Sequence, residues 1–183
     1  MHDHYAIRPH SNDLVIATGT MNITMSFLTR LAAPFLKLTG TLVARPGSNI
    51  DVTVKFTSDA ENGWMCFDRS FTFEDGQQVQ FFSRMQPVGD NQIIEWTQSG
   101  VGWRAAFSFE NDQVHLTHKG YNINLFGHII NLPVSWLFGY GNAREHATSP
   151  TGFDMEMTLT HPLWGQIYGY DGHFEITKVA LDE

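Results

Sequence analysis

The amino-acid sequence predicts a mainly β protein, an antiparallel meander that forms a barrel or a strongly curved sheet. Two observations predict this fold class. Turn-forming residues recur between Trp64 and His118 at intervals of roughly ten to fourteen residues, which is typical of hairpins in an all-β chain. Between these turns, apolar and polar residues alternate with a period of two, so each strand has one face for a core and one for water.

Length, composition and charge limit the classes of protein to consider. The 183 residues fit a single antiparallel β domain over residues 14–183, preceded by an N-terminal segment, residues 1–13. One cysteine, Cys66, cannot form an internal disulfide, and no leader sequence is evident, so we expect a cytoplasmic protein. No apolar run approaches the roughly twenty residues of a membrane span. The net charge of −8, with 11 unclustered basic residues, argues against nucleic acid as a partner.

The N-terminal segment, residues 1–13, contains His2, His4 and His10. Their spacing matches no recognised set of metal ligands, so we predict no metal site there. Residues 14–23 are apolar enough for a first strand.

The periodicity changes between residues 24 and 40. Thr24 or Ser26 can cap the start of a helix, and Gly40 lies where a helix would end. Pro34 kinks this helix or divides it into two pieces. We therefore expect one interrupted helix that plugs an end of the sheet or lies across it. The apolar residues at helical spacing are Phe27, Leu28, Leu31, Phe35 and Leu38.

A turn at residues 46–48 leads to a second strand, residues 50–56. Its alternation predicts that Val52, Val54 and Phe56 point inward.

The central meander yields a strand register if every turn closes with a two-residue loop. The predicted cross-strand pairs are Arg84 with Glu95, Trp96 with Ala105, Phe107 with Leu116, and Ala105 with His118. The predicted core face comprises Val79, Phe81, Met85, Ile94, Trp96, Trp103, Phe107, Phe109, Val114 and Leu116. The predicted water face carries Gln80, Arg84, Glu95, Thr97, Arg104, Glu110, His115, Thr117 and Lys119.

The turn at residues 75–76 needs one residue more than a two-residue loop if the strand before it is to point its apolar residues inward. A two-residue turn at Asp75-Gly76 would place Phe67 and Phe71 on the water face, and a slip of one residue reverses this. We therefore predict that Gly76 adopts a left-handed conformation as a bulge after a type I turn. The same slip carries Arg69 inward.

Residues 124–140 form an unusually apolar segment that includes Trp136 and Phe138. Such a segment must be covered by the core, a second subunit or a ligand. We expect it to cover the mouth of a pocket or to form a subunit contact, in which case the protein is a homodimer. Residues 143–147 then resume an extended strand.

The C-terminal hairpin has the clearest alternation in the chain. Counting outward from the turn at residues 161–166 places both Tyr168 and Tyr170 inward. The predicted pairs are Leu159 with Tyr168, Met157 with Tyr170, and Phe153 with Phe174. About ten strands in mostly up-and-down order form a closed barrel or a strongly curved sheet, lipocalin-like in general shape.

Several stretches resemble a bacterial family catalogued as a domain of unknown function, DUF4166. They are residues 28–31, residues 67–71 leading to Phe82-Ser83, residues 120–133, and Gly152 to Met155 through Pro162, Gly165, Tyr168 and Gly172. The resemblance covers roughly residues 14–176 and departs from the family at Phe67, where a tryptophan is expected. It implies that a reductase-like protein is a partner, because members often follow a dehydrogenase-like or epimerase-like nucleotide-binding domain.

The inner face holds the candidate ligand-binding residues. They are Arg69, Ser83, Gln98, His118, Tyr168 and Tyr170, together with Trp136 from the apolar segment. An inward arginine keeps its charge and needs an anion. Arg69 either forms a structural ion pair, with Glu145 or Asp171 as the expected partner, or binds the carboxylate or phosphate head of an apolar ligand with help from Tyr168 and Tyr170.

No phosphate loop, nucleophile elbow or helical histidine pair appears, so we predict no catalytic residues, no cofactor and no metal, although distant residues could still converge. His115 and His118 lie three apart on a strand and therefore point to opposite faces. Two functions remain. The barrel binds an apolar or amphiphilic small molecule of acyl-chain or isoprenoid type, or it is a filled-core interaction module that partners an oxidoreductase-type nucleotide-binding protein.

Overall fold

The computed structural model describes residues 6–182, and it confirms the mainly β prediction. The strands are β1 (Leu14–Met25), β2 (Gly47–Ser58), β3 (Met65–Thr72), β4 (Gln78–Gly89), β5 (Gln92–Thr97), β6 (Val101–Glu110), β7 (Gln113–Leu125), β8 (His128–Leu132), β9 (Tyr140–Ala147), β10 (Gly152–His161) and β11 (Gly165–Ala180). The helices are α1 (Phe27–Leu31), α2 (Ala33–Thr39) and α3 (Ser135–Phe138).

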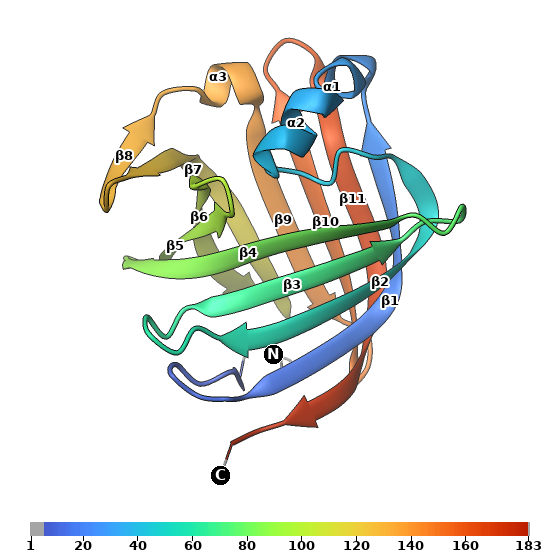
Figure 1. Cartoon of the computed structure of the whole chain (residues 1–183), viewed down its shortest axis with the longest axis vertical. Helices are drawn as coiled ribbons and strands as arrows, with labels where there is room; N and C mark the ends of the chain where they lie inside the picture. Colours follow the sequence, from blue (N-terminus) through green and yellow to red (C-terminus); the bar gives the residue numbers. More distant parts are fainter. Residues whose placement is uncertain (1–5, 183) are drawn as a thin grey trace.

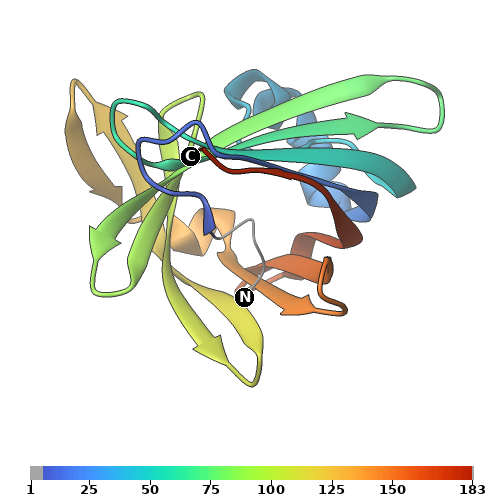
Figure 2. The ribbon, with the colours of Figure 1, turned by 90° about the horizontal axis from the view of Figure 1, so that it is seen from below.

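The strands form a closed antiparallel barrel. Ten of them make the ring, in the order β6-β5-β4-β3-β2-β1-β11-β10-β9-β7, and the pairing of β6 with β7 closes it. β8 pairs only with β7 and extends beyond the ring as a hairpin. Figure 2 shows from below how the first strand, in blue, runs beside the last, in red. Closure removes the unpaired sheet edges that an open sheet would expose to other chains.

The predicted helix is interrupted at the predicted place. Ser26 caps α1 by accepting a hydrogen bond from the backbone N–H of Thr29, and the hydroxyl of Thr29 donates to the carbonyl of Ile167 at 2.7 Å. Pro34 lies in the first turn of α2, where a missing N–H costs nothing, and α2 ends at the left-handed Gly40. Figure 1 shows α1, α2 and α3 at one end of the barrel, with the start of β1 and the end of β11 toward the other.

The predicted bulge at Gly76 is confirmed. Gly76 has a φ of 80° and donates its N–H to the carbonyl of Phe73, so Phe71 pairs with Val79. The resulting register turns Arg69 inward, opposite Phe81. Four further predicted pairs are also confirmed, Phe107 with Leu116, Ala105 with His118, Leu159 with Tyr168, and Met157 with Tyr170, as is the stacked pair Phe153 and Phe174.

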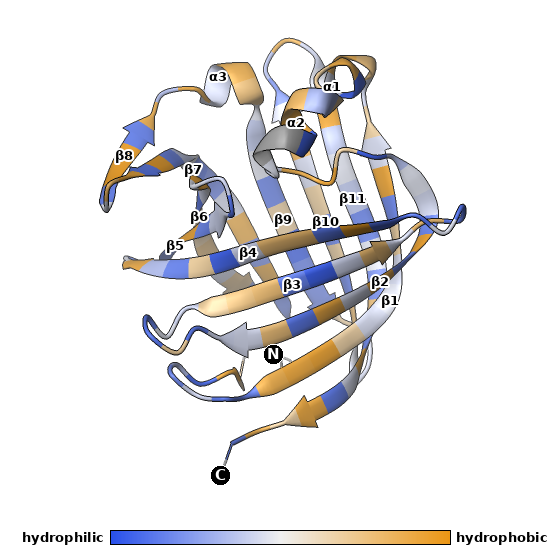
Figure 3. Ribbon diagram, viewed as in Figure 1, coloured by the Kyte–Doolittle hydropathy of each residue, from blue (hydrophilic) through white to orange (hydrophobic). Residues whose placement is uncertain are grey.

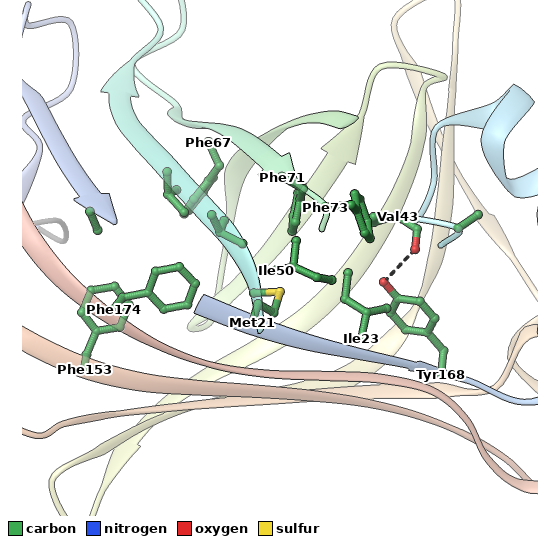
Figure 4. Packing of buried hydrophobic residues seen from close by; sticks show 14 of the residues in the cluster. Met21, Ile23, Val43, Ile50, Phe67, Phe71, Phe73, Phe153, Tyr168 and Phe174 are labelled. Carbon is green, nitrogen blue, oxygen red and sulfur yellow. Dashed lines mark hydrogen bonds between the residues drawn. The ribbon is translucent and has the colours of Figure 1, made fainter. Parts of the chain in front are cut away.

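The barrel is filled at the end away from the helices. The fully buried Phe153 and Phe174 rings stack at 5.4 Å there, and Val15 and Ala17 of β1 are completely inaccessible. Figure 4 shows this packing, with Phe153 and Phe174 on one side and Tyr168 on the other. Figure 3 shows the alternation of hydrophobic and hydrophilic residues along the strands that produces this interior.

The described part of the N-terminal segment, residues 6–13, is tied to the C-terminal end of the chain. Arg8 donates to Asp13 at 2.9 Å from its Nε, and the backbone N–H of Asp182 donates to Asp13 at 2.7 Å. The Arg8 guanidinium holds the pKa of the buried Asp13 carboxyl well below its usual range.

His2 and His4 lie outside the described residues. No helix of the described part is long and apolar enough to cross a membrane.

Candidate functional site

A cavity of about 600 Å³ occupies the end of the barrel that carries the helices. Along β1, Met21 and Ile23 line it, whereas Val15 and Ala17 lie below it in the packed core. Apolar side chains dominate the wall, and few charged groups interrupt it. The wall residues that matter below are Leu28, Phe35, Arg69, Phe81, Glu95, Trp103, Tyr121, Leu137, Phe138, Met155, Met157, Trp164, Tyr168 and Tyr170.

The mouth of the cavity lies between α1 and α2 on one side and α3 on the other. Phe35, Leu137 and Phe138 line the cavity and are also 59%, 47% and 44% exposed. Exposed fractions this large place these side chains at an end of the cavity that is open to solvent. The apolar segment 124–140 therefore contributes α3 to the mouth.

Arg69 forms a compact polar cluster on the cavity wall. Its Nη1 donates to the Ser83 hydroxyl at 2.8 Å and its Nη2 donates to Oε1 of Glu95 at 3.0 Å. The Ser83 hydroxyl in turn donates to the same Glu95 oxygen at 2.6 Å. The guanidinium also lies 4.8 Å and 5.3 Å from the ring centroids of Phe67 and Phe81, within range of cation–π attraction.

The carboxylate partner of Arg69 is Glu95, so the predicted partners Glu145 and Asp171 are wrong. Glu95 was expected on the water face because Arg84 was paired with it. In the structure Arg84 pairs with Trp96, and Met85 pairs with Glu95. A shift of one residue moves every side chain of β5 to the opposite face. Glu95 and Thr97 therefore line the cavity.

The shift of one residue between β4 and β5 has a local cause that is visible in the sequence. Asp90 and Asn91 both adopt left-handed conformations and form the two-residue loop, so Gly89 pairs with Gln92. The register then changes between Pro87 and Gly89. A proline inside a strand is typical of such a bulge, because it has no N–H for the ladder. The residue types at 87, 90 and 91 were therefore the features of the sequence from which the inward position of Glu95 could have been predicted.

Two residues of β5, Ile94 and Trp96, are buried as predicted but do not line the cavity. Trp96 pairs with Gly102 rather than with Ala105, and its indole N–H donates to the Gln86 side chain at 2.7 Å. A Cβ at Gly102 would lie 2.5 Å from Ile94 and 2.6 Å from the Trp96 ring. The glycine thus leaves room for both side chains, which are 1% and 5% exposed.

Gln98 is not part of the site. It lies in the turn between β5 and β6 and is exposed, because the loop spans residues 98–100 and Thr97 already pairs across it. The prediction of an inward Gln98 is therefore wrong, for the same reason of register.

Tyr168 and Tyr170 both line the cavity, as their predicted inward positions require. The Tyr168 hydroxyl donates to the carbonyl of Val43 at 3.2 Å, which holds the chain after α2 against β11 (Figure 4). Among the described residues, the Tyr170 hydroxyl has no hydrogen-bond partner. Burial raises the pKa of Tyr170 to about 12, and that of Tyr168 is raised further by the same cause. Both phenols are therefore neutral donors at neutral pH.

His118 lies behind the wall rather than in it. Its Nδ1 accepts a hydrogen bond from the indole N–H of Trp103 at 3.0 Å, and its Nε2 lies 2.9 Å from the Ser135 hydroxyl of α3. An indole nitrogen only donates, so Nδ1 carries no proton and Nε2 carries one. His118 thus connects the cavity residue Trp103 to the helix at the mouth.

We expect His118 to titrate with a pKa below about 6.5 in the folded protein, because burial disfavours its charged form. A depressed pKa means that the stability contributed by neutral His118 is complete above the unfolded value and is lost as pH falls through the folded value. Nuclear magnetic resonance of the imidazole protons would measure the pKa. A midpoint at or above about 6.5, the usual value for histidine, would contradict this expectation.

Trp136 is at the mouth but does not line the cavity. Its side chain is 66% exposed, and its neighbours Leu137 and Phe138 form the lining instead. Ser83 is fully buried and acts through Arg69 and Glu95. The residues of the wall that sequence reasoning did not assign to the site include Glu95, Trp103, Tyr121, Met155, Met157 and Trp164.

Comparison with known proteins identifies a family but no function. A family model described as a domain of unknown function, DUF4166, matches residues 1–174. No curated protein matches the chain. The crystal structure of Rv2717c from M. tuberculosis is similar with a TM-score of 0.49 at 10% identity, over 89% of this chain and 91% of that one. The dehydratase domain of the polyketide PpsC from Mycobacterium tuberculosis gives a TM-score of 0.20 at 7% identity, over 95% and 78%.

Proposed function

The chain belongs to the DUF4166 family of domains of unknown function, and we propose that this member is a binding module for an apolar or amphiphilic small molecule. The observation that carries the proposal is the cavity of about 600 Å³. Ligand pockets in proteins commonly measure about 300–1,000 Å³ and are lined by apolar and aromatic side chains with a few polar groups. An acyl chain or an isoprenoid fits this description.

The polar cluster supports a ligand with a neutral polar head. Glu95 already neutralises Arg69, so a carboxylate or phosphate head would have to displace Glu95 to bind the guanidinium. The hydroxyl of Tyr170, in contrast, lines the cavity close enough to Arg69 and Glu95 for their charges to affect its pKa. A hydroxyl or carbonyl on the ligand could form a hydrogen bond with it. The pairing therefore favours the first of the two alternatives for Arg69, a structural ion pair, over the binding of an anionic head.

The cavity favours the binding module over the alternative function, a filled-core interaction module. A reductase-like partner, implied by the family resemblance, is a separate proposal that a ligand-binding barrel also permits. Copurification of the full chain with a candidate reductase would test it.

The purified full chain should yield a bound small molecule when it is extracted with organic solvent and the extract is examined by mass spectrometry. It should also take up N-phenylnaphthylamine, and hexadecanol should displace this neutral probe more effectively than hexadecanoate does. Replacing Met157 by tryptophan should fill the cavity and abolish uptake, because Met157 lines the wall.

Thr158→Ser is the matched control, because Thr158 lies on the opposite face of the same strand and should leave uptake unchanged. An empty extract together with no uptake of the probe would refute the proposed function. Stronger displacement by hexadecanoate would restore Arg69 as an anion site.

A further inference from the structure

The mouth of the cavity is surrounded by exposed apolar side chains from three separate segments. Leu28 and Phe35 come from α1 and α2, Leu137 and Phe138 from α3, and Trp164 from the loop between β10 and β11. All five line the cavity and are between 39% and 59% exposed. Figure 1 shows these three segments at the same end of the barrel, and Figure 3 shows hydrophobic residues on α1 and α3.

Four further apolar residues of the same three segments are even more exposed. Phe27 is 78% exposed, Leu31 71%, Trp136 66% and Leu163 80%. We call these four residues and the five above the rim. Leaving a large apolar side chain in water forfeits roughly 2 kcal/mol, and soluble monomers rarely expose a contiguous patch of this kind without a function.

The segments that carry the rim contain no acidic residue and contain two basic residues. The segments that carry the rim, residues 24–44, 120–140 and 160–167, contain no aspartate or glutamate, although the chain has 19. The same segments contain the exposed cations Arg30 and Lys37. In a chain of net charge −8, these segments thus carry no negative charge that would repel an array of phosphate groups, and their two cations would attract one.

These observations point to one kind of partner. A bilayer surface offers apolar chains beneath phosphate groups, and tryptophans at its interface are favoured because their rings are amphipathic. Exposed apolar residues with flanking lysine and arginine are typical of proteins that lie on such a surface. The cavity opens inside the rim, so an apolar ligand that moved from the bilayer into the barrel would cross no water.

We propose that the rim docks on the surface of a lipid bilayer, with the mouth of the cavity against it. Docking itself requires only the rim, and the transfer of a ligand through the mouth rests on the proposed function. The protein would then exchange an apolar molecule with a membrane without spanning it.

The experiment is flotation of the full chain with vesicles, either of phosphatidylcholine alone or of phosphatidylcholine with phosphatidylglycerol. We expect binding to both, and tighter binding to the second. Leu163→Ser combined with Trp164→Ser should weaken binding to both by at least about tenfold, because two exposed side chains lose their apolar contact. Arg30→Gln combined with Lys37→Gln should remove only the gain from phosphatidylglycerol.

Leu181→Ser is the control, because Leu181 is 52% exposed near the C-terminus at the opposite end. It should float like the unchanged chain, and equal loss in this variant would overturn the proposal. So would absence of flotation with either vesicle. Concentration-dependent dimers that disappear with Leu163→Ser and Trp164→Ser, without flotation, would instead assign the rim to a contact between two copies. Flotation together with an empty solvent extract would refute the proposed function and leave the docking intact.

Discussion

Replacing Phe174 by alanine is expected to lower the free energy of unfolding by about 3 to 5 kcal/mol, the usual cost of removing a buried aromatic ring. Phe174 is completely inaccessible and stacks on Phe153 at 5.4 Å. Neighbouring groups cannot close the gap easily, because the strands on both sides are held in the closed ring. The ring of Phe174 is thus central to the filled end of the barrel.

Urea denaturation followed by circular dichroism would measure this loss. Phe109→Ala is the matched control, because Phe109 is 49% exposed and should cost less than about 1 kcal/mol. A similar cost in both variants would mean that the packed end contributes no more to stability than the surface does.

Breaking the Arg69 and Glu95 pair from one side is expected to cost about 3 kcal/mol, whether by Arg69→Met or by Glu95→Gln. The two side chains are only 13% and 18% exposed, so either one left alone is a poorly solvated charge. Combining Arg69→Met with Glu95→Gln removes both charges. The double variant should therefore recover most of the stability that each single variant loses.

A double-mutant cycle in urea would measure the coupling between the two residues. The exposed pair Arg144 and Glu156, with side chains 58% and 39% exposed, is the control and should show a coupling below about 1 kcal/mol. Additive losses at Arg69 and Glu95 would show that the pair is not energetically coupled. The cycle also separates stability from ligand binding, since the uncharged double variant retains the Tyr170 hydroxyl.

The sequence alone predicted a structural feature correctly where the residues that produce the feature lie close together in the chain. The helix is capped by Ser26 and divides at Ala32, two residues before Pro34, because capping and the missing proline N–H act within one turn. The left-handed Gly76 followed from a conflict between apolar residues on two adjacent strands. The C-terminal hairpin was paired correctly from its alternation, which placed Tyr168 and Tyr170 inside the barrel.

The register of β5 could not be predicted from the neighbouring residues alone. Two-residue loops at every turn would have placed Glu95 in water, but the bulge between Pro87 and Gly89 added a residue. An error of one residue reverses both faces of a strand, so Trp96 was paired wrongly and Gln98 was misplaced together with Glu95. The partner of Arg69 could therefore be identified only once the neighbouring strand was in place.

Sequence by itself determined the strands, most of their turns and the class of the fold, because alternation and turn residues act over neighbouring positions. Only the tertiary structure decided that β6 pairs with β7 to close the ring and that the interior is hollow at one end. Whether side chains fill a barrel depends on the volumes that strands distant in sequence bring to the same layer. Phe153 and Phe174 fill one layer, whereas Met157 and Tyr170 line the cavity.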